Sequence, residues 1–516
     1  MFHFYLIDKM NEHKYIILIF IFYFTLRLIN LTTLPIFNDE AIYLDWGWRM
    51  THVPGNLYFS LYDGKQPLLM WIFGIFESFL PDPLFAGRLV SVLAGSIALL
   101  GIYRICIQFF NKKIAYLATI FYIITPLFSF YDRQALMESS ISAVNIWSCY
   151  FFLRFSGTPI KKYAIWIGAI LGIGFFIKSS SLILIFTYLI LGVVIFLIHF
   201  KTNKMYIKNI LVAILVILMI NMLLLINPSF WNTFYLNNRY SMSITELLSL
   251  PLLKWLNNTV SFLEISLWHT TLLSILAVLG VVSTLKGSNR QSKYLASWMV
   301  ITFLLLFLLA NTILPRYVVS FLPFISIFSA HFIYVVSARL QKIAFFVCCF
   351  AILTSFSLLI VQIFSPLNYF SQLSKVTKFS QRSDYVTAWT SGYGIENVRK
   401  FLSNESKNTR IIAAVRIDAG NPESSVFTYY ARPQNIIPIY LDGNINREIE
   451  GFDCIKSSFP IYFISRDEQL ANLNKFLTLI KKINKPEKKS FIGIYKVNST
   501  CKGKILIVDE SSLNIN

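Results

Sequence analysis

The chain has 516 residues, of which 56% are hydrophobic and only 14% charged. A water-soluble globular domain carries more charge than this, so the composition excludes that class and indicates a membrane protein. The formal net charge of +20 is a feature shared with nucleic-acid-binding proteins. Here the lysines and arginines fall in short clusters between apolar runs rather than in one basic arm, so we expect no nucleic-acid partner and assign the charge to membrane topology.

Long apolar runs follow one another along the first 365 residues, and several reach the length that crosses a bilayer. They predict a polytopic α-helical membrane protein with about eleven transmembrane helices. The expected spans lie near residues 15–34, 84–106, 114–131, 136–154, 163–177, 180–199, 210–227, 267–285, 295–313, 317–337 and 343–364. The apolar stretch 68–80 is too short to span and contains Glu77, so we expect it to lie in the membrane interface.

The basic residues between these runs alternate regularly from one side to the other. The clusters that share one side are Lys9/Lys14, Lys112/Lys113, Arg154/Lys161/Lys162, Lys201/Lys204/Lys208, Lys286/Arg290/Lys293 and Arg339/Lys342. By the positive-inside rule this side is the cytoplasm. The pattern predicts a multi-pass protein of the cytoplasmic membrane, with a cytoplasmic N-terminus and the segment after residue 365 outside.

The last part of the chain, residues 366–516, changes in composition and predicts a separate extracytoplasmic α/β domain beside the transmembrane domain 1–365. Expected strands cover 410–415, 436–441, 460–465, 491–497 and 504–508, and expected helices cover 395–402 and 470–483. This domain has no glycine-rich phosphate-binding loop, so no nucleotide is assigned to it. Cys454 and Cys501 are its only cysteines, and whether they form a disulfide is left open.

An acidic segment follows the first apolar run and contains Asp39, Glu40 and Asp45. Carboxylates beside a membrane span are costly to desolvate, so they indicate a functional site when other charged residues accompany them. Taken alone they fit charges that simply lie in water better than a functional site. The remaining predicted outer loops supply those companions: Lys65, Arg88, Asp132, Arg133, Glu138, Lys178, Arg239 and Arg316. Arginine and lysine both bind phosphate, so the set suits an anionic lipid headgroup. Membrane-interface anchoring is the alternative for each single residue.

Short motifs in a fixed order give the chain a resemblance to a known family. They are Asp39-Glu40 after the first span, Lys65-Gln66-Pro67, Gly87-Arg88, Tyr131-Asp132-Arg133 with Glu138, Lys178 at the end of a span, and Pro315-Arg316-Tyr317. Residues 1–340 thereby resemble the GT-C glycosyltransferases of family 39 type. That family includes protein O-mannosyltransferases, aminoarabinose transferases of lipid A and rhizobial lipopolysaccharide sugar transferases. Residues 389–394 are similar to the start of the outer domain in some bacterial members. Two positions depart from the pattern: Glu138 replaces the usual Asp, and Ser179 follows Lys178 where Gly is common.

The resemblance implies transfer of a sugar from a polyprenyl-phosphate donor to a glycan, lipid or protein acceptor at the outer membrane face. Inverting transfer needs one carboxylate to deprotonate the acceptor. Asp39 is the expected base, with Glu40 binding sugar hydroxyls or orienting the loop. The expected substrate-binding residues are Lys65, Arg88, Arg133, Glu138, Lys178, Arg239, Arg316 and Tyr317, with Glu138 as a supporting carboxylate. Fixed cations stabilise the leaving phosphate, so neither a metal nor another cofactor is expected.

The segment 231–268 is rich in tryptophan, tyrosine and asparagine and is expected to form a loop. It suits a mobile cover that stacks on sugar, and it equally suits an aromatic belt at the membrane interface. Two other function classes stay open at this point: a lipid or solute transporter or flippase of the envelope, and a non-catalytic envelope scaffold. The sequence shows no internal repeat, which transporters often have. The sugar, the acceptor, the role of the C-terminal domain and the oligomeric state are not indicated.

Overall fold

The computed structural model describes residues 12–199, 205–237, 239–416, 420–432, 434–441, 454–456, 459–466, 477–488, 490–498 and 505–507. The chain forms two compact units that are both discontinuous in sequence. The first comprises Met1–Leu31, Asn56–Ile72 and Arg88–Ser380, and the second comprises Thr32–Gly55, Phe73–Gly87 and Gln381–Asn516. The acidic segment therefore belongs to the unit that contains the C-terminal region. The division of the chain after residue 365 stays a prediction.

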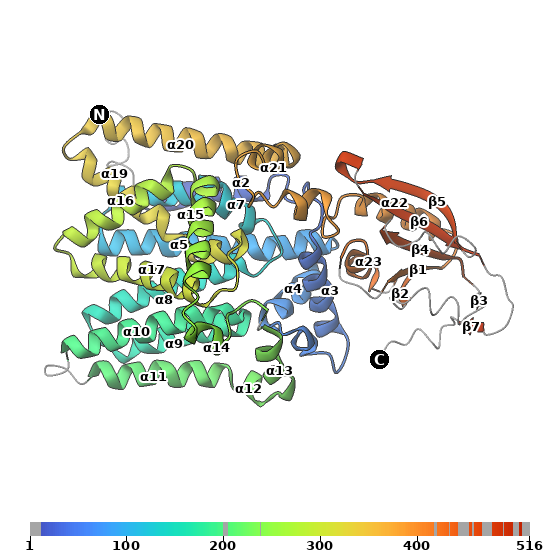
Figure 1. Cartoon of the computed structure of the whole chain (residues 1–516), viewed down its shortest axis with the longest axis horizontal. Helices are drawn as coiled ribbons and strands as arrows, with labels where there is room; N and C mark the ends of the chain where they lie inside the picture. The colour runs from blue at the N-terminus through green and yellow to red at the C-terminus, as the bar shows by residue number, and fades with distance from the viewer. Residues whose placement is uncertain are drawn as a thin grey trace. The chain divides into compact units, whose positions relative to one another are not determined.

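The first unit is helical (Figure 1). Its helices are α2 (Glu12–Leu28), η1 (Phe59–Asp63), α6 (Lys112–Ile124), α7 (Pro126–Asp132), α8 (Glu138–Gly157), α9 (Lys161–Ile177), η2 (Ser179–Ser181), α10 (Leu182–His199), α11 (Met205–Ile220), α12 (Met222–Ile226), α13 (Pro228–Asn237), α14 (Ile244–Leu248), α15 (Leu252–Thr270), α16 (Leu273–Lys286), α17 (Arg290–Leu309), α18 (Pro315–Val318), η3 (Val319–Phe321), α19 (Phe324–Ser337), α20 (Gln341–Phe364) and α21 (Pro366–Leu373). Helices α4 (Leu68–Phe79) and α5 (Pro83–Phe109) each contribute residues to both units. Within the bundle, α9 packs against α8 and α11, and α16 packs against α19.

Exposed apolar side chains identify the bundle as a membrane domain. Helix α20 carries the exposed side chains of Phe345, Phe346, Phe350 and Leu353, a surface that water would not tolerate as a large patch. In the described part of the chain, four helices are long and apolar enough to cross a membrane, and counting three bent helix pairs gives up to seven. The predicted membrane-protein class is confirmed, whereas the number of about eleven spans stays a prediction.

Bends divide three of the apolar runs into helix pairs, which accounts for part of the difference from the predicted number of spans. Helices α6 and α7 meet at 65°, where Pro126 begins α7 and removes a backbone donor. Helices α15 and α16 meet at 113° around Thr271, whose φ of 57° cannot continue a right-handed helix. The predicted span 267–285 was therefore wrong at its start, because α15 continues to Thr270 and a new helix begins at Leu273.

The predicted loop 231–268 was also wrong. Helix α13 continues to Asn237, α14 covers Ile244–Leu248, and α15 covers most of the remainder. Serine favours turns, but Ser243 acts as a helix cap here and accepts a hydrogen bond from the Glu246 amide at 3.2 Å. Only residues 239–243 connect α13 to α14 without helix among the described positions.

The second unit combines the acidic helix with an α/β layer (Figure 1). Its elements are α3 (Asn38–His52), η4 (Ser383–Thr387), α22 (Ile395–Glu405), β1 (Ile411–Arg416), α23 (Glu423–Tyr430), β2 (Ile436–Leu441), β3 (Cys454–Lys456), β4 (Ile461–Arg466), β5 (Leu477–Asn484), η6 (Pro486–Lys488), β6 (Phe491–Val497) and β7 (Ile505–Ile507). Five strands form a sheet in the order β2-β1-β4-β6-β5, and β3 pairs with β7. Strands β2, β1 and β4 are parallel, while β6 is antiparallel to both β4 and β5.

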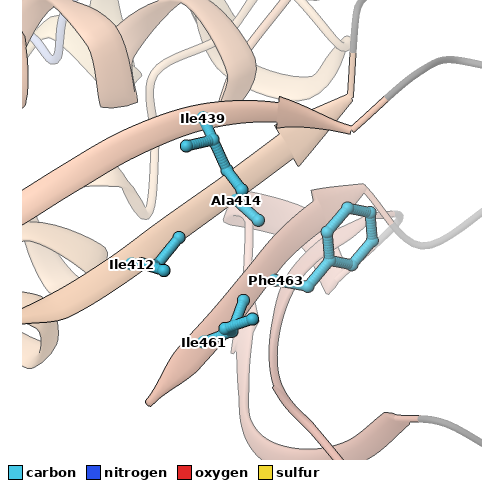
Figure 2. Packing of buried hydrophobic residues seen from close by; sticks show 5 residues of the cluster. All are labelled: Ile412, Ala414, Ile439, Ile461 and Phe463. Carbon is cyan, nitrogen blue, oxygen red and sulfur yellow. The ribbon is translucent and has the colours of Figure 1, made fainter. Parts of the chain in front are cut away.

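Alternating apolar side chains from the three parallel strands build the sheet core (Figure 2). Ile412 and Ala414 come from β1, Ile439 from β2, and Ile461 and Phe463 from β4. Residues two positions apart point to the same face of a strand, so this period-two pattern produces one continuous apolar layer. It is the pattern that predicted these strands, and the α/β character of the C-terminal region is confirmed.

The helix predicted over 470–483 was wrong from residue 477 onward, because residues 477–484 form the strand β5. Its first part, 470–476, lies outside the described residues. The partner strand β6 supplies backbone hydrogen bonds from Leu477 to Asn484, interrupted by an irregularity between Leu479 and Lys481. Strand β5 is an edge strand and mostly exposed, and its lysines are typical protection against edge-to-edge pairing. Whether Cys454 and Cys501 form a disulfide stays open, because Cys501 lies outside the described residues.

Candidate functional site

Four charged side chains predicted from the sequence converge in the first unit. The Glu138 carboxylate, which has 0% exposed surface, accepts a hydrogen bond from Lys178 Nζ at 2.8 Å and lies 3.5 Å from Arg316 Nε. Lys178 also experiences the positive charge of Lys65. We call these four residues the basic cluster. Three cations accompany one carboxylate, so positive charge is in excess and the cluster is suited to bind an anion.

Helix ends position the central ion pair. Glu138 is the first residue of α8, where the helix dipole favours a carboxylate, and Lys178 caps the C-terminal end of α9, where it favours a cation. Gln66 Oε1 accepts a hydrogen bond from the Ser179 amide at 3.1 Å. This bond attaches the loop that carries Lys65 to the residue after Lys178, so two distant segments are held at one place.

A chain of buried polar groups holds the backbone of Glu138 from inside the bundle. Ser320 Oγ donates to the Glu138 carbonyl at 3.1 Å, Asn145 Nδ2 donates to the Ser320 carbonyl at 3.1 Å, and Trp298 Nε1 donates to Asn145 Oδ1 at 2.9 Å. Sequence reasoning missed Ser320, Asn145 and Trp298. A lone asparagine within an apolar span was the signal that could have found this chain, because a buried amide requires partners.

Two tyrosines lie among the cations. Lys65 Nζ donates to Tyr240 Oη at 3.2 Å and lies 4.7 Å from the ring centroid, and the Arg239 guanidinium lies 4.9 Å from that same centroid. The Tyr240 and Tyr317 rings are 6.2 Å apart, and Lys178 Nζ lies 6.0 Å from the Tyr317 ring. Such cation–π contacts orient the side chains and add aromatic surface beside the charged groups. The sequence predicted Arg239 and Tyr317 as substrate-binding residues, and Tyr240 only as part of the aromatic segment 231–268.

A short backbone pairing holds Tyr240 in place. Ser241 forms an antiparallel bridge with Ala310, and the Asn311 amide donates to the Tyr240 carbonyl at 3.0 Å. Arg239, which was predicted to bind substrate, forms an ion pair with Asp63 at 3.1 Å. Its charge is therefore balanced locally, and it lies at the edge of the basic cluster rather than at the centre.

The buried polar atoms of this region that make no hydrogen bond within the described part of the chain include Glu138 Oε2 and Gln66 Nε2. Buried polar atoms are normally satisfied, so this acceptor and this donor are available to a bound molecule. One acceptor and one donor beside excess positive charge suit a ligand that carries both hydroxyl groups and an anionic group.

Arg88 and Arg133, predicted as phosphate ligands, instead hold the end of α2. Arg88 Nη1 donates to the Leu31 carbonyl at 2.8 Å. The Arg133 guanidinium donates to four carbonyls in the last turn and beyond it, those of Leu26, Arg27, Ile29 and Asn30, at 2.8–3.0 Å. Helix C-termini leave carbonyls unsatisfied, and a guanidinium fork satisfies several at once.

The Asp132 side chain of the Tyr-Asp-Arg motif is likewise internal. Its carboxylate lies 3.1 Å from Arg27 Nε and accepts hydrogen bonds from Tyr23, Tyr122 and Ser139. A buried charge needs such a set of partners to remain ionised. The motif therefore organises the interior of the bundle around α2, α6 and α8.

The predicted base lies in the second unit, near the start of α3. Asp39 is its second residue and half-buried, with Asn38 Nδ2 3.4 Å from its carboxylate. Glu40 is fully buried, and its Oε2 accepts a hydrogen bond from the Phe37 amide at 2.9 Å. That bond satisfies a free donor at the helix start, as the glutamate of a capping box does. Asp45 forms an ion pair with Arg49 at 3.0 Å one turn later.

No group of three or more His, Cys, Asp or Glu among the described residues is arranged to hold a metal ion. The cations of the basic cluster are side chains of the chain itself. Independence from metal and other cofactors stays a prediction.

Comparisons with known proteins agree with the geometry. Residues 64–224 match the sequence profile of the dolichyl-phosphate-mannose-protein mannosyltransferase family. The structure matches ArnT from Cupriavidus metallidurans in the apo state with a TM-score of 0.61, at 12% identity, over 93% of this chain and 97% of that chain. The chain has the GT-C fold. The resemblance predicted from the short motifs is thereby confirmed.

Two further structures share the GT-C fold. One is ArnT from the same organism bound to undecaprenyl phosphate, with a TM-score of 0.56, 13% identity and coverage of 93% of this chain and 97% of that chain. The other is the Archaeoglobus fulgidus oligosaccharyltransferase in the apo form, with a TM-score of 0.53, 12% identity and coverage of 88% and 69%. No curated protein sequence matches this chain. The matched profile includes Lys65, Glu138 and Lys178 but ends before Arg316.

Proposed function

We propose that the protein is a membrane glycosyltransferase that moves a sugar from a polyprenyl-phosphate donor to a glycan, lipid or protein acceptor. The GT-C fold and the matched mannosyltransferase profile support this class of reaction. A related structure was solved with undecaprenyl phosphate, which supports a lipid phosphate as donor carrier. The alternation of basic clusters supports a reaction at the outer membrane face, with about eleven spans and a cytoplasmic N-terminus.

The basic cluster is the proposed binding site of the donor phosphate, and its excess positive charge is the observation that carries this proposal. Lys178 and Arg316 have side chains that are 20% and 19% exposed, so they are accessible to a ligand while most of their surface is dry. Charge interactions are stronger in such surroundings than in water. As the glycosidic bond breaks, these cations stabilise the leaving phosphate, which requires no metal.

The roles of the carboxylates follow from their surroundings. Asp39 is the proposed general base, because it is a half-buried carboxylate at the start of α3, a few residues after the first apolar run, and belongs to the acidic pair of the motif pattern. Glu40 accepts a hydrogen bond from the Phe37 amide of the same segment, so its proposed role is to orient Asp39. Glu138 is a supporting carboxylate that holds Lys178 and Arg316 and offers Oε2 to a sugar hydroxyl.

Binding of undecaprenyl phosphate to the purified protein in nanodiscs tests the donor site. Lys178→Gln removes one positive charge from the basic cluster, and we expect the Kd to rise about tenfold or more, because a charge-assisted hydrogen bond contributes about 1.5–3 kcal/mol. Lys254→Gln is the matched control, since Lys254 belongs to the same unit but pairs with Glu246 and Asn311. Equal affinity of both variants and the unmodified protein would remove the basic cluster from the donor site.

A further inference from the structure

The start of α3 is held by residues of the C-terminal region that belong to the same compact unit. Backbone groups of residues 36, 38 and 41 and the side chain of Asn38 form hydrogen bonds with that region. The hydrogen bonds run from Asn421 Nδ2 to the Ile36 carbonyl (3.2 Å), from the Asn38 amide to the Thr390 carbonyl (3.0 Å), from Ser424 Oγ to Asn38 Oδ1 (3.0 Å) and from Thr428 Oγ1 to the Ala41 carbonyl (2.6 Å). We call Asn421, Ser424 and Thr428 the clamp residues. All of them are buried.

Close packing accompanies these bonds. Helix α23, which carries Ser424 and Thr428, packs directly on α3 (Figure 1). Gly392 approaches so closely that a Cβ atom there would lie 2.0 Å from the Ile36 carbonyl oxygen. The Phe37 ring stacks on Tyr385 with centroids 4.5 Å apart. The chain immediately before Asp39 is therefore enclosed by backbone and rigid rings, which leave it little room to move.

The clamp fixes the residues on both sides of Asp39. Asn38 is held through its amide and its side chain, Glu40 is tied to the Phe37 amide, and Ala41 is held through its carbonyl. These bonds are made by the neighbours of Asp39 and not by its carboxylate. A general base has to be placed within about half an ångström of its working position, and this is achieved by locking the surrounding residues.

The same contacts explain two features of the sequence that the proposed reaction leaves unused. The motif at residues 389–394 supplies the Thr390 carbonyl and the close approach of Gly392. Helix α23 directly follows the turn after β1 and brings Ser424 and Thr428 to α3. The carboxyl ends of parallel strands commonly bind ligands. In this unit, residues 421–428, which follow β1, contact the segment 36–41 of the same chain.

We propose that the C-terminal α/β region is a positioning element for the general base, with Asn421, Ser424 and Thr428 as positioning residues. This inference rests on the proposed function, because that proposal assigns Asp39 as the base. It predicts that the clamp acts on turnover through Asp39 and does not contribute to binding of the donor.

Ser424→Ala is the first test, because it removes the hydroxyl bonded to Asn38 and leaves no large cavity. We expect kcat for transfer from a polyprenyl-phosphate-linked sugar to fall about 10- to 100-fold, the range expected for a misplaced catalytic group. The KM for the donor and the Kd for undecaprenyl phosphate should stay unchanged. Thr428→Val, which loses the bond to the Ala41 carbonyl, is a second variant in case the first does not fold.

Tyr430→Phe is the matched control. Tyr430 ends the same helix, and its hydroxyl donates to the Arg399 carbonyl at 3.0 Å, away from α3. This change removes one hydrogen bond of α23 but none from the clamp. We expect it to lower the melting temperature while kcat stays close to that of the unmodified protein. A Tyr430→Phe variant that loses as much kcat as Ser424→Ala would assign both effects to general stability and overturn the inference.

A double-mutant cycle separates this inference from the proposed function. If Ser424 acts through the base, Ser424→Ala should cost kcat in the native background and almost nothing in the Asp39→Asn background. Equal costs in both backgrounds would overturn the positioning role and leave the proposed reaction intact. Full turnover by Asp39→Asn alone would overturn the proposed base, and with it this inference.

Discussion

At the scale of single residues, the two principal carboxylates have surroundings that suit different tasks. Glu138 is enclosed by its ion-pair partners Lys178 and Arg316, an arrangement that suits a supporting carboxylate. Asp39 lies half-buried at a helix start and next to an asparagine. The motif pattern assigned the base to Asp39, but the sequence could not show that Glu138 is enclosed by Lys178 and Arg316, because these cations come from distant parts of the chain.

Asp39→Asn keeps the shape of the side chain and removes the base. We expect transfer to fall about 10²–10⁴-fold, the usual contribution of a positioned acid–base group. Undecaprenyl phosphate should bind as before, because the proposed phosphate ligands are Lys65, Lys178 and Arg316. Single-turnover kinetics with bound donor measure the chemical step directly. Normal turnover by this variant together with an inactive Glu138→Gln would reverse the two assignments.

Glu138→Gln should act on stability and on anion binding before it acts on chemistry. The change leaves Lys178 and Arg316 without their carboxylate, and breaking a buried pair on one side costs about 3–5 kcal/mol, less here because both cations are partly exposed. We expect a lower melting temperature that undecaprenyl phosphate raises more strongly than in the unmodified protein. Differential scanning fluorimetry with and without this lipid is the measurement, and an unchanged ligand effect would contradict it.

Glu77 gives the second unit a pH-dependent stability. Burial raises the pKa of this carboxyl from 4.5 to about 8, although Arg432, 3.0 Å away, opposes the shift and Asp45 adds to it. The folded protein then holds the proton more tightly than the unfolded chain. Its stabilising contribution is complete below pH 4.5 and is lost as the pH rises through about 8. The melting temperature should fall over this interval, and Glu77→Gln should flatten the slope. Glu396→Gln, at an exposed pair with Arg399, is the control and should leave the slope intact.

At the scale of elements, most charged groups of the candidate site lie at helix ends and not in helix interiors. Glu138 is the first residue of α8, and Lys178 caps the end of α9. Asp39 and Glu40 lie in the first turn of α3, and Arg133 donates hydrogen bonds to carbonyls at the end of α2. Free backbone groups at helix ends attract charges of the matching sign. In a membrane bundle these ends are also the places where a charged side chain can avoid the hydrocarbon.

Arg133→Lys distinguishes support of α2 from phosphate binding. Lysine keeps the positive charge but cannot reach four carbonyls at once, so the end of α2 loses several charge-assisted hydrogen bonds. We expect a loss of about 2–4 kcal/mol of stability with an unchanged Kd for undecaprenyl phosphate. A weakened Kd at normal stability would restore Arg133 to the donor site. Chemical denaturation followed by tryptophan fluorescence reports the first quantity.

At the scale of the whole molecule, the sequence predicted helices and strands correctly where the apolar residues follow one regular spacing along a segment. Apolar runs located the helices of the bundle, and period-two runs located β2 and β6 at their correct bounds. They failed where tertiary pairing decides, as in β5, whose residues also fit a helical spacing until β6 supplies the backbone partners. The union of residues 32–55 with the C-terminal region was likewise invisible, because side-chain hydrogen bonds such as Ser424–Asn38 connect positions hundreds of residues apart. The basic cluster itself could be predicted only as a set of charges, because tertiary packing decides which of these charges meet and which uncharged neighbours, such as Asn145, support them.

Membrane topology is the remaining prediction at this scale, and it determines on which side transfer takes place. The cluster Lys286, Arg290 and Lys293 lies between α16 and α17 and is predicted to be cytoplasmic, whereas the C-terminal region is predicted to be outside. Green fluorescent protein fused after residue 288 should fluoresce, and the same fusion after residue 516 should be dark. Alkaline phosphatase fused at the same positions should give the opposite activities, which controls for expression. A fluorescent fusion at residue 516 would place the α/β region in the cytoplasm. Transfer would then take place on the cytoplasmic face, and a donor delivered to the outer leaflet would no longer be the substrate.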